Sequence, residues 1–263
     1  MLILAAACTR VEPVADTKPG ELLVTVRHGA ITAPDSAAPG WIRLRVEEAE
    51  DKHIVVAFRL PVGTSDADVR AFVAALDATP ATPSPAVALG GPEVGASGEV
   101  MIRVEAGVYV LACVRRGDDD KRHAGKGESK VVHVRAAVAA DSVTPAAPSG
   151  AQDVRLVDFA YVGPDHWPSD TRWLRIENTG KQDHQVRLAR LRAGTSVQQW
   201  LSADDPDTVA TTFTGVARLG AGQTVFLPVE LTPGTYVMYC LVSDPVTRRA
   251  HVEMGMLRMI TVP

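Results

Sequence analysis

The sequence has few aromatic residues, few cysteines and no excess of positive charge. Aromatic residues make up 5% of the 263 residues, and three residues are cysteine. Three cysteines cannot all pair with one another, which excludes a disulfide-rich scaffold. Lysine and arginine total 27 against 31 aspartate and glutamate residues, for a net charge of −4. The basic surface on which nucleic-acid binding depends is therefore missing, and we expect no nucleic-acid partner.

Long hydrophobic runs are also missing. The longest, Leu2 to Cys8, is far shorter than the roughly 20 apolar residues of a membrane-spanning helix. This run resembles the end of a bacterial lipoprotein signal, in which small residues precede a cysteine that is lipidated after cleavage. The resemblance implies membrane attachment through a lipidated Cys8, at the periplasmic or extracellular face of a bacterial cell envelope. Because a basic segment is missing before the run, we expect the true initiation site to lie upstream.

The chain carries one pattern of residues twice, and such a repeat decides how the rest is interpreted. A histidine is followed ten residues later by Gly-Thr-Ser, at His53 and again at His184. Further on, a segment with the pattern Gly-x-Tyr ends in a cysteine, Cys113 in the first copy and Cys240 in the second. A polar loop, a histidine and a glycine follow each cysteine, and these histidines are His123 and His251.

The repeat predicts two homologous domains. We place them at residues 21–138 and 153–263, after a signal remnant and tether in residues 1–20. The segment between them, residues 139–152, is rich in alanine, proline and serine, which is typical of a linker.

Each copy consists mainly of short segments in which apolar and polar residues alternate, separated by turn residues. These segments predict strands at 22–27, 41–46, 54–60, 100–104, 108–114 and 130–134, and again at 155–162, 173–177, 185–191, 224–231, 236–242 and 257–262. A helix is predicted after Ser65, which is a favourable cap followed by carboxylates, and a shorter copy at Val197–Leu201. Short antiparallel strands with one inserted helix per copy predict an all-β fold of two β-sandwiches.

The second copy resembles a cupredoxin in three segments. Asn178-Thr-Gly-Lys-Gln-Asp-His184 is similar to the loop that supplies the first copper ligand in that family, and residues 233–240 are similar to the strand that delivers the cysteine. His251 followed by Gly-Met is similar to the closing segment. The resemblance implies two tandem Greek-key sandwiches and one copper bound in the second. Its implied ligands are His184, Cys240, His251 and, as a weak axial ligand, Met256.

Two departures from the family pattern matter for the site. Ten residues, 241–250, separate Cys240 from His251, where the family has only a few; such a loop can still fold back, because closure entropy grows slowly with length. The first copy keeps His53, Cys113 and His123, but Glu128 stands where Met256 aligns. A hard carboxylate suits a different metal or none, so we predict a degenerate second site.

The resemblance implies electron transfer or copper handling, with a redox protein as partner. The sequence contains none of the motifs of serine hydrolases, zinc proteases or nucleotide-binding enzymes, and on that ground we expect no enzyme. An alternative hypothesis is a metal-free tandem β-sandwich lipoprotein that acts as a binding module. In that case the cysteine and histidine positions serve packing. Separately, a disulfide between Cys113 and Cys240 is an alternative for these two thiols in an oxidising compartment.

Overall fold

The computed structural model describes residues 20–48, 53–77, 85–93, 97–135 and 145–263. Cys8, nearly all of the predicted tether and the first part of the predicted linker lie outside the described residues. Among the helices that are described, none has the length and apolar character needed to cross a membrane.

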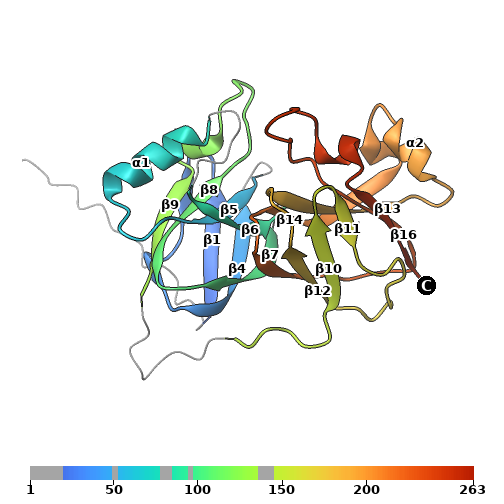
Figure 1. Cartoon of the computed structure of the whole chain (residues 1–263), viewed down its shortest axis with the longest axis horizontal. Helices are drawn as coiled ribbons and strands as arrows, with labels where there is room; N and C mark the ends of the chain where they lie inside the picture. Colours follow the sequence, from blue (N-terminus) through green and yellow to red (C-terminus); the bar gives the residue numbers. More distant parts are fainter. Residues whose placement is uncertain (1–19, 49–52, 78–84, 94–96, 136–144) are drawn as a thin grey trace, which may run out of the picture.

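Two β-sheets form the two layers of the molecule, and each runs through both halves of the chain (Figure 1). The eight-stranded sheet has the order β11 (Ala160–Val162), β10 (Gln152–Val157), β12 (Trp173–Asn178), β15 (Thr224–Pro228), β7 (Ser97–Val104), β4 (Gly40–Glu48), β1 (Glu21–Arg27) and β2 (Ala30–Thr32). The nine-stranded sheet has the order β17 (Leu257–Val262), β16 (Gly234–Tyr239), β13 (His184–Leu191), β14 (Ala210–Leu219), β6 (Val87–Pro92), β5 (Val55–Arg59), β8 (Gly107–Cys113), β9 (Ser129–Val134) and β3 (Ser36–Ala37). The predicted all-β fold is confirmed.

The two halves, β1–β9 and β10–β17, are joined by strand pairing in both sheets. β15 pairs with β7 in one layer, and β14 pairs with β6 in the other, both antiparallel. Beside the first junction, Trp41 of β4 contacts Phe226 of β15 edge to face, with ring centroids 5.1 Å apart. We call this double junction the seam. Each half is a sandwich, and the seam makes the two sandwiches share continuous sheets.

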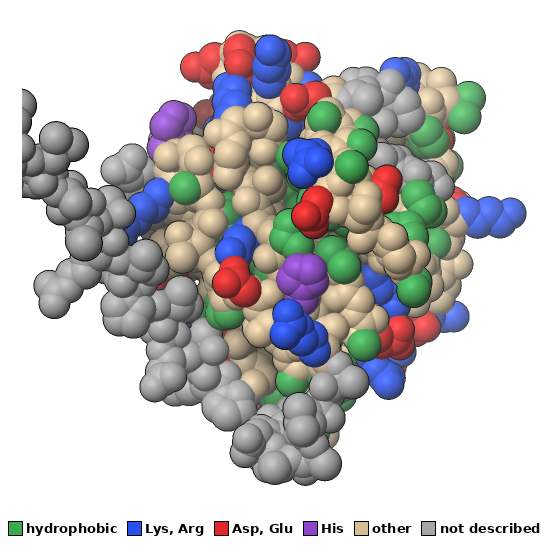
Figure 2. Space-filling view, turned by 90° about the vertical axis from the view of Figure 1, so that its left-hand side faces the viewer, with side chains coloured by type: hydrophobic (Ala, Val, Ile, Leu, Met, Phe, Trp, Pro, Cys, Tyr) green, Lys and Arg blue, Asp and Glu red, His purple; other side chains and the backbone are tan. Residues whose placement is uncertain are grey.

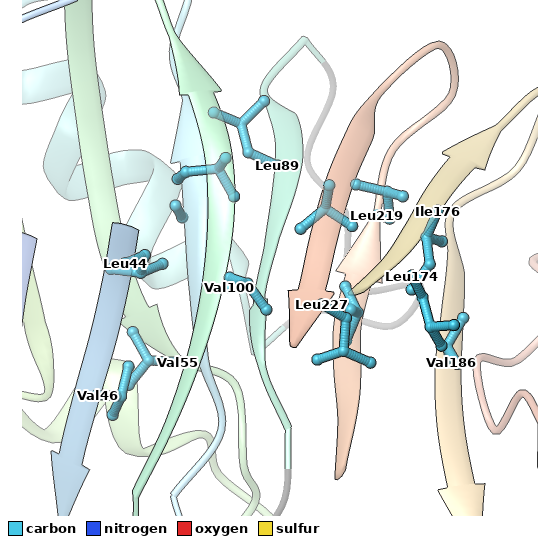
Figure 3. Close-up of a cluster of buried hydrophobic side chains, with 14 of the residues drawn as sticks. Leu44, Val46, Val55, Leu89, Val100, Leu174, Ile176, Val186, Leu219 and Leu227 are labelled. Carbon is cyan, nitrogen blue, oxygen red and sulfur yellow. The ribbon is translucent and has the colours of Figure 1, made fainter. Parts of the chain in front are cut away.

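Buried and more exposed residues alternate along the strands, and this alternation explains why the hydrophobic core also runs through both halves. Every second residue of β1 is buried, and β12 behaves in the same way, so each strand turns one apolar face toward the opposite layer. Figure 3 shows Leu44 and Val100 of the first half, and Leu219 and Leu227 of the second, in one cluster of buried side chains. On the end of the molecule formed by the first half, basic and acidic side chains are interspersed (Figure 2).

Both predicted helices are confirmed. α1 (Asp66–Ala75) follows Ser65, and α2 (Val197–Leu201) follows Ser196. In each case the serine hydroxyl accepts a hydrogen bond from the third helical amide, and the side chain at that position bonds back to the serine amide. This reciprocal capping satisfies two backbone donors that the first turn leaves open.

Three details of the strands differ from the prediction. The segment 155–162 is not one strand, because a turn at Asp158 and Phe159 divides it into β10 and β11. β2, β3, β6 and β14 were not predicted. Some neighbouring strands are parallel, β1 with β4 and β10 with β12, because the chain crosses over through intervening residues before it returns to the sheet. The domain boundaries at 138 and 153 stay a prediction.

Candidate metal centres

The second half brings three predicted site residues together. His184 begins β13, Cys240 follows β16, and His251 begins the short 3-10 helix η3 (His251–Met254). The Nδ1 atoms of His184 and His251 lie 3.1 Å apart, and Sγ of Cys240 lies 3.5 Å from Nδ1 of His251. All three side chains are buried, and their donor atoms lie within 4.8 Å of one another.

Met256 lies against this group through its backbone. Its amide donates a hydrogen bond to the carbonyl of His251 at 2.9 Å, and its carbonyl accepts one from the amide of Cys240 at 3.3 Å. The side chain of Met256 is fully buried. Gly255, with φ of 105°, makes the left-handed turn that ends η3 and brings Met256 back to the cysteine.

Two neighbouring side chains decide which nitrogen of each imidazole faces the group. Nε2 of His184 lies 2.7 Å from Oδ1 of Asp158, and Nε2 of His251 lies 3.1 Å from Oε1 of Gln182. Both oxygens only accept hydrogen bonds, since the amide nitrogen of Gln182 donates instead to Asp244 at 2.7 Å. Each Nε2 therefore carries the ring proton, and each Nδ1 presents a lone pair to the group.

The charge state of the group follows from its burial. Burial lowers the pKa of His251 to about 4, with a further contribution from His184, and burial also lowers the pKa of His184. Both imidazoles are then neutral at pH 7, and two lone pairs face each other at 3.1 Å without a proton between them. The two Nδ1 atoms would hold a cation between them, which would replace this repulsive contact by coordination. The donor arrangement thus fits a metal ion.

The thiol completes the donor set. Burial raises the pKa of Cys240 to about 12, so the metal-free protein holds a neutral thiol at pH 7. Cys240 would hold a metal ion as the thiolate, because the positive charge of the ion would offset the cost of burying that thiolate. The thiol of Cys240 is not in a disulfide, and neither is that of Cys113, so the disulfide considered for this pair does not form.

The loop 241–250 is held in place by one buried carboxylate. Oδ1 of Asp244 accepts hydrogen bonds from the amides of Val246 and Thr247 at 3.1 and 2.5 Å, and from the hydroxyl of Thr247 at 2.8 Å. The hydrogen bonds from Thr247, followed by that from Gln182, lower the pKa of Asp244 to about 2. Asp244 therefore folds the loop and also orients Gln182, which contacts His251. The ten-residue loop 241–250 therefore folds back and brings His251 to Cys240.

The loop before His184 is built around Asn178 and Gly180. The side-chain amide of Asn178 donates to the carbonyls of Gln182 and Leu219, both at 2.8 Å, and its oxygen accepts from the amide of Gly180 at 3.0 Å. A Cβ on Gly180 would lie 2.4 Å from Oδ1 of Asp158. Only glycine at this position therefore lets Asp158 reach His184. Asp158, Gln182 and Asp244 were not predicted as site residues.

The first half gathers a related group with a different fourth member. His53, Cys113 and His123 meet Glu128, and the four donor atoms lie within 4.8 Å of one another. Oε2 of Glu128 lies 2.8 Å from Nδ1 of His53 and 3.2 Å from Nδ1 of His123, and Sγ of Cys113 lies 3.6 Å from Nδ1 of His53. The carboxylate of Glu128 thus stands between the two imidazoles.

Comparison with known proteins found matches among solved structures. The sequence matches no family model and no curated protein. The structure is similar to reduced auracyanin from Roseiflexus castenholzii, at 22% identity, over 43% of this chain and 99% of auracyanin, with a TM-score of 0.30. It is also similar to a multicopper oxidase and to the copper nitrite reductase of Nitrosomonas europaea, both at 12% identity and a TM-score of 0.26. These two alignments cover 92% of this chain, and 88% and 93% of the other chains.

The fold is cupredoxin-like. The expectation that this cupredoxin-like protein is not an enzyme is wrong, because two structures that it resembles over 92% of its length are named as enzymes. The motifs that are missing belong to hydrolases and nucleotide-binding enzymes. Their absence says nothing about oxidation and reduction at a metal centre.

Proposed function

We propose that this protein binds one copper ion through His184, Cys240 and His251, with Met256 as a weak axial ligand, and that it transfers electrons or handles copper. The observation that supports this proposal most is the approach of the two Nδ1 atoms to 3.1 Å beside a buried thiol, while both Nε2 atoms face hydrogen-bond acceptors. Two neutral imidazoles and one thiolate form the trigonal donor set of an electron-transfer copper site. When bound there, copper supplies reversible one-electron oxidation and reduction.

The chain's own residues prepare the site in three ways. Asp158 and Gln182 hold the imidazoles so that both Nδ1 atoms face the group, and partners of this kind commonly raise metal affinity by about 10- to 100-fold. Asp244 holds the loop between Cys240 and His251 in its folded form. The buried position of all three ligands excludes water, which favours outer-sphere electron transfer to a redox protein partner over reaction with solvent.

The test is a Cu(II) titration of the reduced full-length chain, followed by the visible absorption of the thiolate-to-copper transition. Cys8→Ser serves as the background for all variants, so that this thiol does not contribute. We expect one equivalent of copper to give a blue or green band. The band should vanish in Cys240→Ser and persist in the matched variant Cys113→Ser.

Two results would overturn the proposal. A titration without a band in the parent chain would support the metal-free binding module instead. A band that survives Cys240→Ser but not Cys113→Ser would place the copper in the first half.

The proposal places the protein outside the cytoplasm, attached through lipidated Cys8. The support is the sequence pattern that ends at Cys8, and acyl chains attached there would strengthen membrane affinity by about 0.8 kcal/mol per buried CH₂. Expression in a bacterium with labelled fatty acid should give a labelled protein that partitions into detergent. Cys8→Ser should be unlabelled and remain in the aqueous phase. An unlabelled parent protein would exclude lipidation.

A further inference from the structure

We propose that Glu128 completes a second metal site with His53, Cys113 and His123, and that this site takes a divalent ion such as Zn²⁺ in preference to Cu(I). The four donor atoms lie within 4.8 Å of one another on buried or half-buried side chains. One sulfur, two imidazole nitrogens and one carboxylate oxygen are ligand types that zinc accepts, and four is the number that it prefers. The proposal does not depend on copper binding in the second half.

The backbone positions the carboxylate of Glu128 for this role. Oε1 accepts a hydrogen bond from the amide of Gly29 at 3.1 Å, which leaves Oε2 facing the two imidazoles. Gly127 precedes Glu128 with φ of 105°, and a Cβ on Gly127 would lie 2.6 Å from the carbonyl oxygen of Gly29. Because Gly127 has no side chain, the turn after β1 can approach the cluster. The amide of Gly29 in that turn then holds Oε1 of Glu128. This arrangement fixes the direction of the other oxygen.

Ligand charge separates this site from the one in the second half. Cys113 as a thiolate and Glu128 as a carboxylate supply two negative charges, which balance those of a divalent ion. Cys240 alone supplies one, which balances Cu(I). Buried ions are costly unless neighbouring charges compensate them, so the two sites favour ions of different charge. Oxygen is also a harder ligand than the thioether at the equivalent position in the second half, which again disfavours Cu(I).

The contacts of Glu128 also fit a second arrangement. Its Oε2 lies 2.8 Å from Nδ1 of His53 and 3.2 Å from Nδ1 of His123. Without a metal, the same geometry allows both imidazoles to donate hydrogen bonds from Nδ1 to Oε2. A metal-free His–Glu–His network is therefore the alternative that an experiment must separate from a metal site.

The experiment uses the full-length chain with Cys8→Ser and Cys240→Ser, which removes the other two thiols. Co²⁺ reports the coordination directly, because a tetrahedral site with a thiolate gives intense visible bands and a sulfur-to-cobalt transition in the near ultraviolet. Zn²⁺ affinity is then measured by displacement of Co²⁺ and by competition with a chromophoric chelator. We expect one equivalent of each ion to bind, and Cys113→Ser to abolish the sulfur-to-cobalt transition.

Two substitutions test Glu128 itself. Glu128→Gln removes the charge at nearly constant shape and should weaken Zn²⁺ binding at least about 10-fold, since even partners outside the coordination shell contribute that much. The matched control is Glu105→Gln, at an exposed glutamate paired with Arg59, which should bind as the parent does. Glu128→Met should raise the ratio of Cu(I) to Zn²⁺ affinity.

The outcomes are distinct. Absence of stoichiometric Co²⁺ or Zn²⁺ binding in the parent would leave the hydrogen-bonded network and overturn the proposal. Parent-like Zn²⁺ affinity in Glu128→Gln, or unchanged selectivity in Glu128→Met, would remove Glu128 from the ligand set. Circular dichroism of each variant shows whether it is folded. Because Cys240 is absent throughout, none of these results bears on copper in the second half.

Discussion

Asp158 accepts a hydrogen bond from Nε2 of His184 at 2.7 Å, and this contact directs Nδ1 of the same ring toward Cys240 and His251. The amide of Lys181 donates to the other carboxylate oxygen at 2.9 Å. Asp158 is thereby fixed between the loop before β13 and the imidazole that begins it. The orientation of the first histidine thus depends on a residue 26 positions earlier in the chain.

Replacing this carboxylate should weaken metal binding without unfolding the protein. In Asp158→Asn the side chain can present an amide donor to Nε2, which favours the ring tautomer that carries its proton on Nδ1. We expect copper affinity to fall by about 10- to 100-fold in a competition titration. Asp153→Asn, at an exposed carboxylate that pairs with Arg175, is the control and should bind as the parent does. Equal affinities in the two variants would contradict the orienting role.

The loop 241–250 should keep its structure in acid until Asp244 is protonated. The pKa of this carboxyl is about 2 in the folded protein, below its ordinary value of 3.8. A lowered pKa means that the stabilisation is fully present above about pH 4 and is lost as the pH falls toward 2. Hydrogen exchange of the Val246 and Thr247 amides, corrected for its intrinsic pH dependence, should therefore accelerate only over that range.

A variant separates this effect from general acid unfolding. Asp244→Ala should show fast exchange at both amides already at neutral pH, while amides of the distant strand β1 stay protected. Slow exchange at Val246 and Thr247 in Asp244→Ala would show that other contacts hold the loop.

The isolated second half should not behave as an independent domain. A fragment of residues 153–263 exposes β14 and β15 along the edges that pair with β6 and β7 in the whole chain. Unpaired edges of this length promote association with other chains. We expect the fragment to dimerise or aggregate in light scattering, whereas the full chain remains monomeric. A monomeric fragment with native-like circular dichroism would show that the seam is dispensable.

Gly91 at the seam should not tolerate a side chain. A Cβ at this position would lie 1.9 Å from the carbonyl oxygen of Val55 on the neighbouring strand. Relief of that overlap requires the backbone to shift, and we expect Gly91→Ala to lower the free energy of unfolding by about 1–3 kcal/mol in urea denaturation. Gly117→Ala is the control, since its Cβ meets only side-chain atoms at 3.1 Å or more. Equal free energies of unfolding for Gly91→Ala and Gly117→Ala would contradict the close approach of Gly91 to the carbonyl oxygen of Val55.

The same glycine explains why sequence reasoning missed the seam. Gly90-Gly91-Pro92 reads as a turn, yet in β6 these residues lie within a sheet because Gly91 must pass close to Val55. β14 was missed as well, although it also pairs with the predicted strand β13, so the pairing of β14 with β6 that joins the halves was not predicted. The helices were predictable because their start depends on local residues, such as Ser65 and the carboxylates that follow it.

In the site, too, the features that depend on neighbouring residues in the sequence were predicted, and those that depend on distant residues were not. The order of His184, Cys240 and His251 was visible because it repeats along the chain, and the structure brings these residues together. Asp158 lies 26 residues before His184, and only the fold brings the two together. Gln182 and Asp244 lie in the two loops next to the ligands, but nothing in their spacing predicts the hydrogen bond that joins them. Glu128 was visible in the sequence only as a mismatch with Met256. Its place between two imidazoles depends on the approach of Gly29.

The seam also governs which backbone groups remain open to other molecules. Because β14, β15, β6 and β7 are interior strands, the described sheets end instead at β2, β3, β11 and β17. Three of these have only two or three residues, and Thr261 of β17 is engaged through backbone hydrogen bonds by Asp165 and Trp167. Short or covered edges offer little template for another chain to extend the sheet. The joining of the halves thus leaves few backbone groups at the edges of the described sheets open to pairing with another chain.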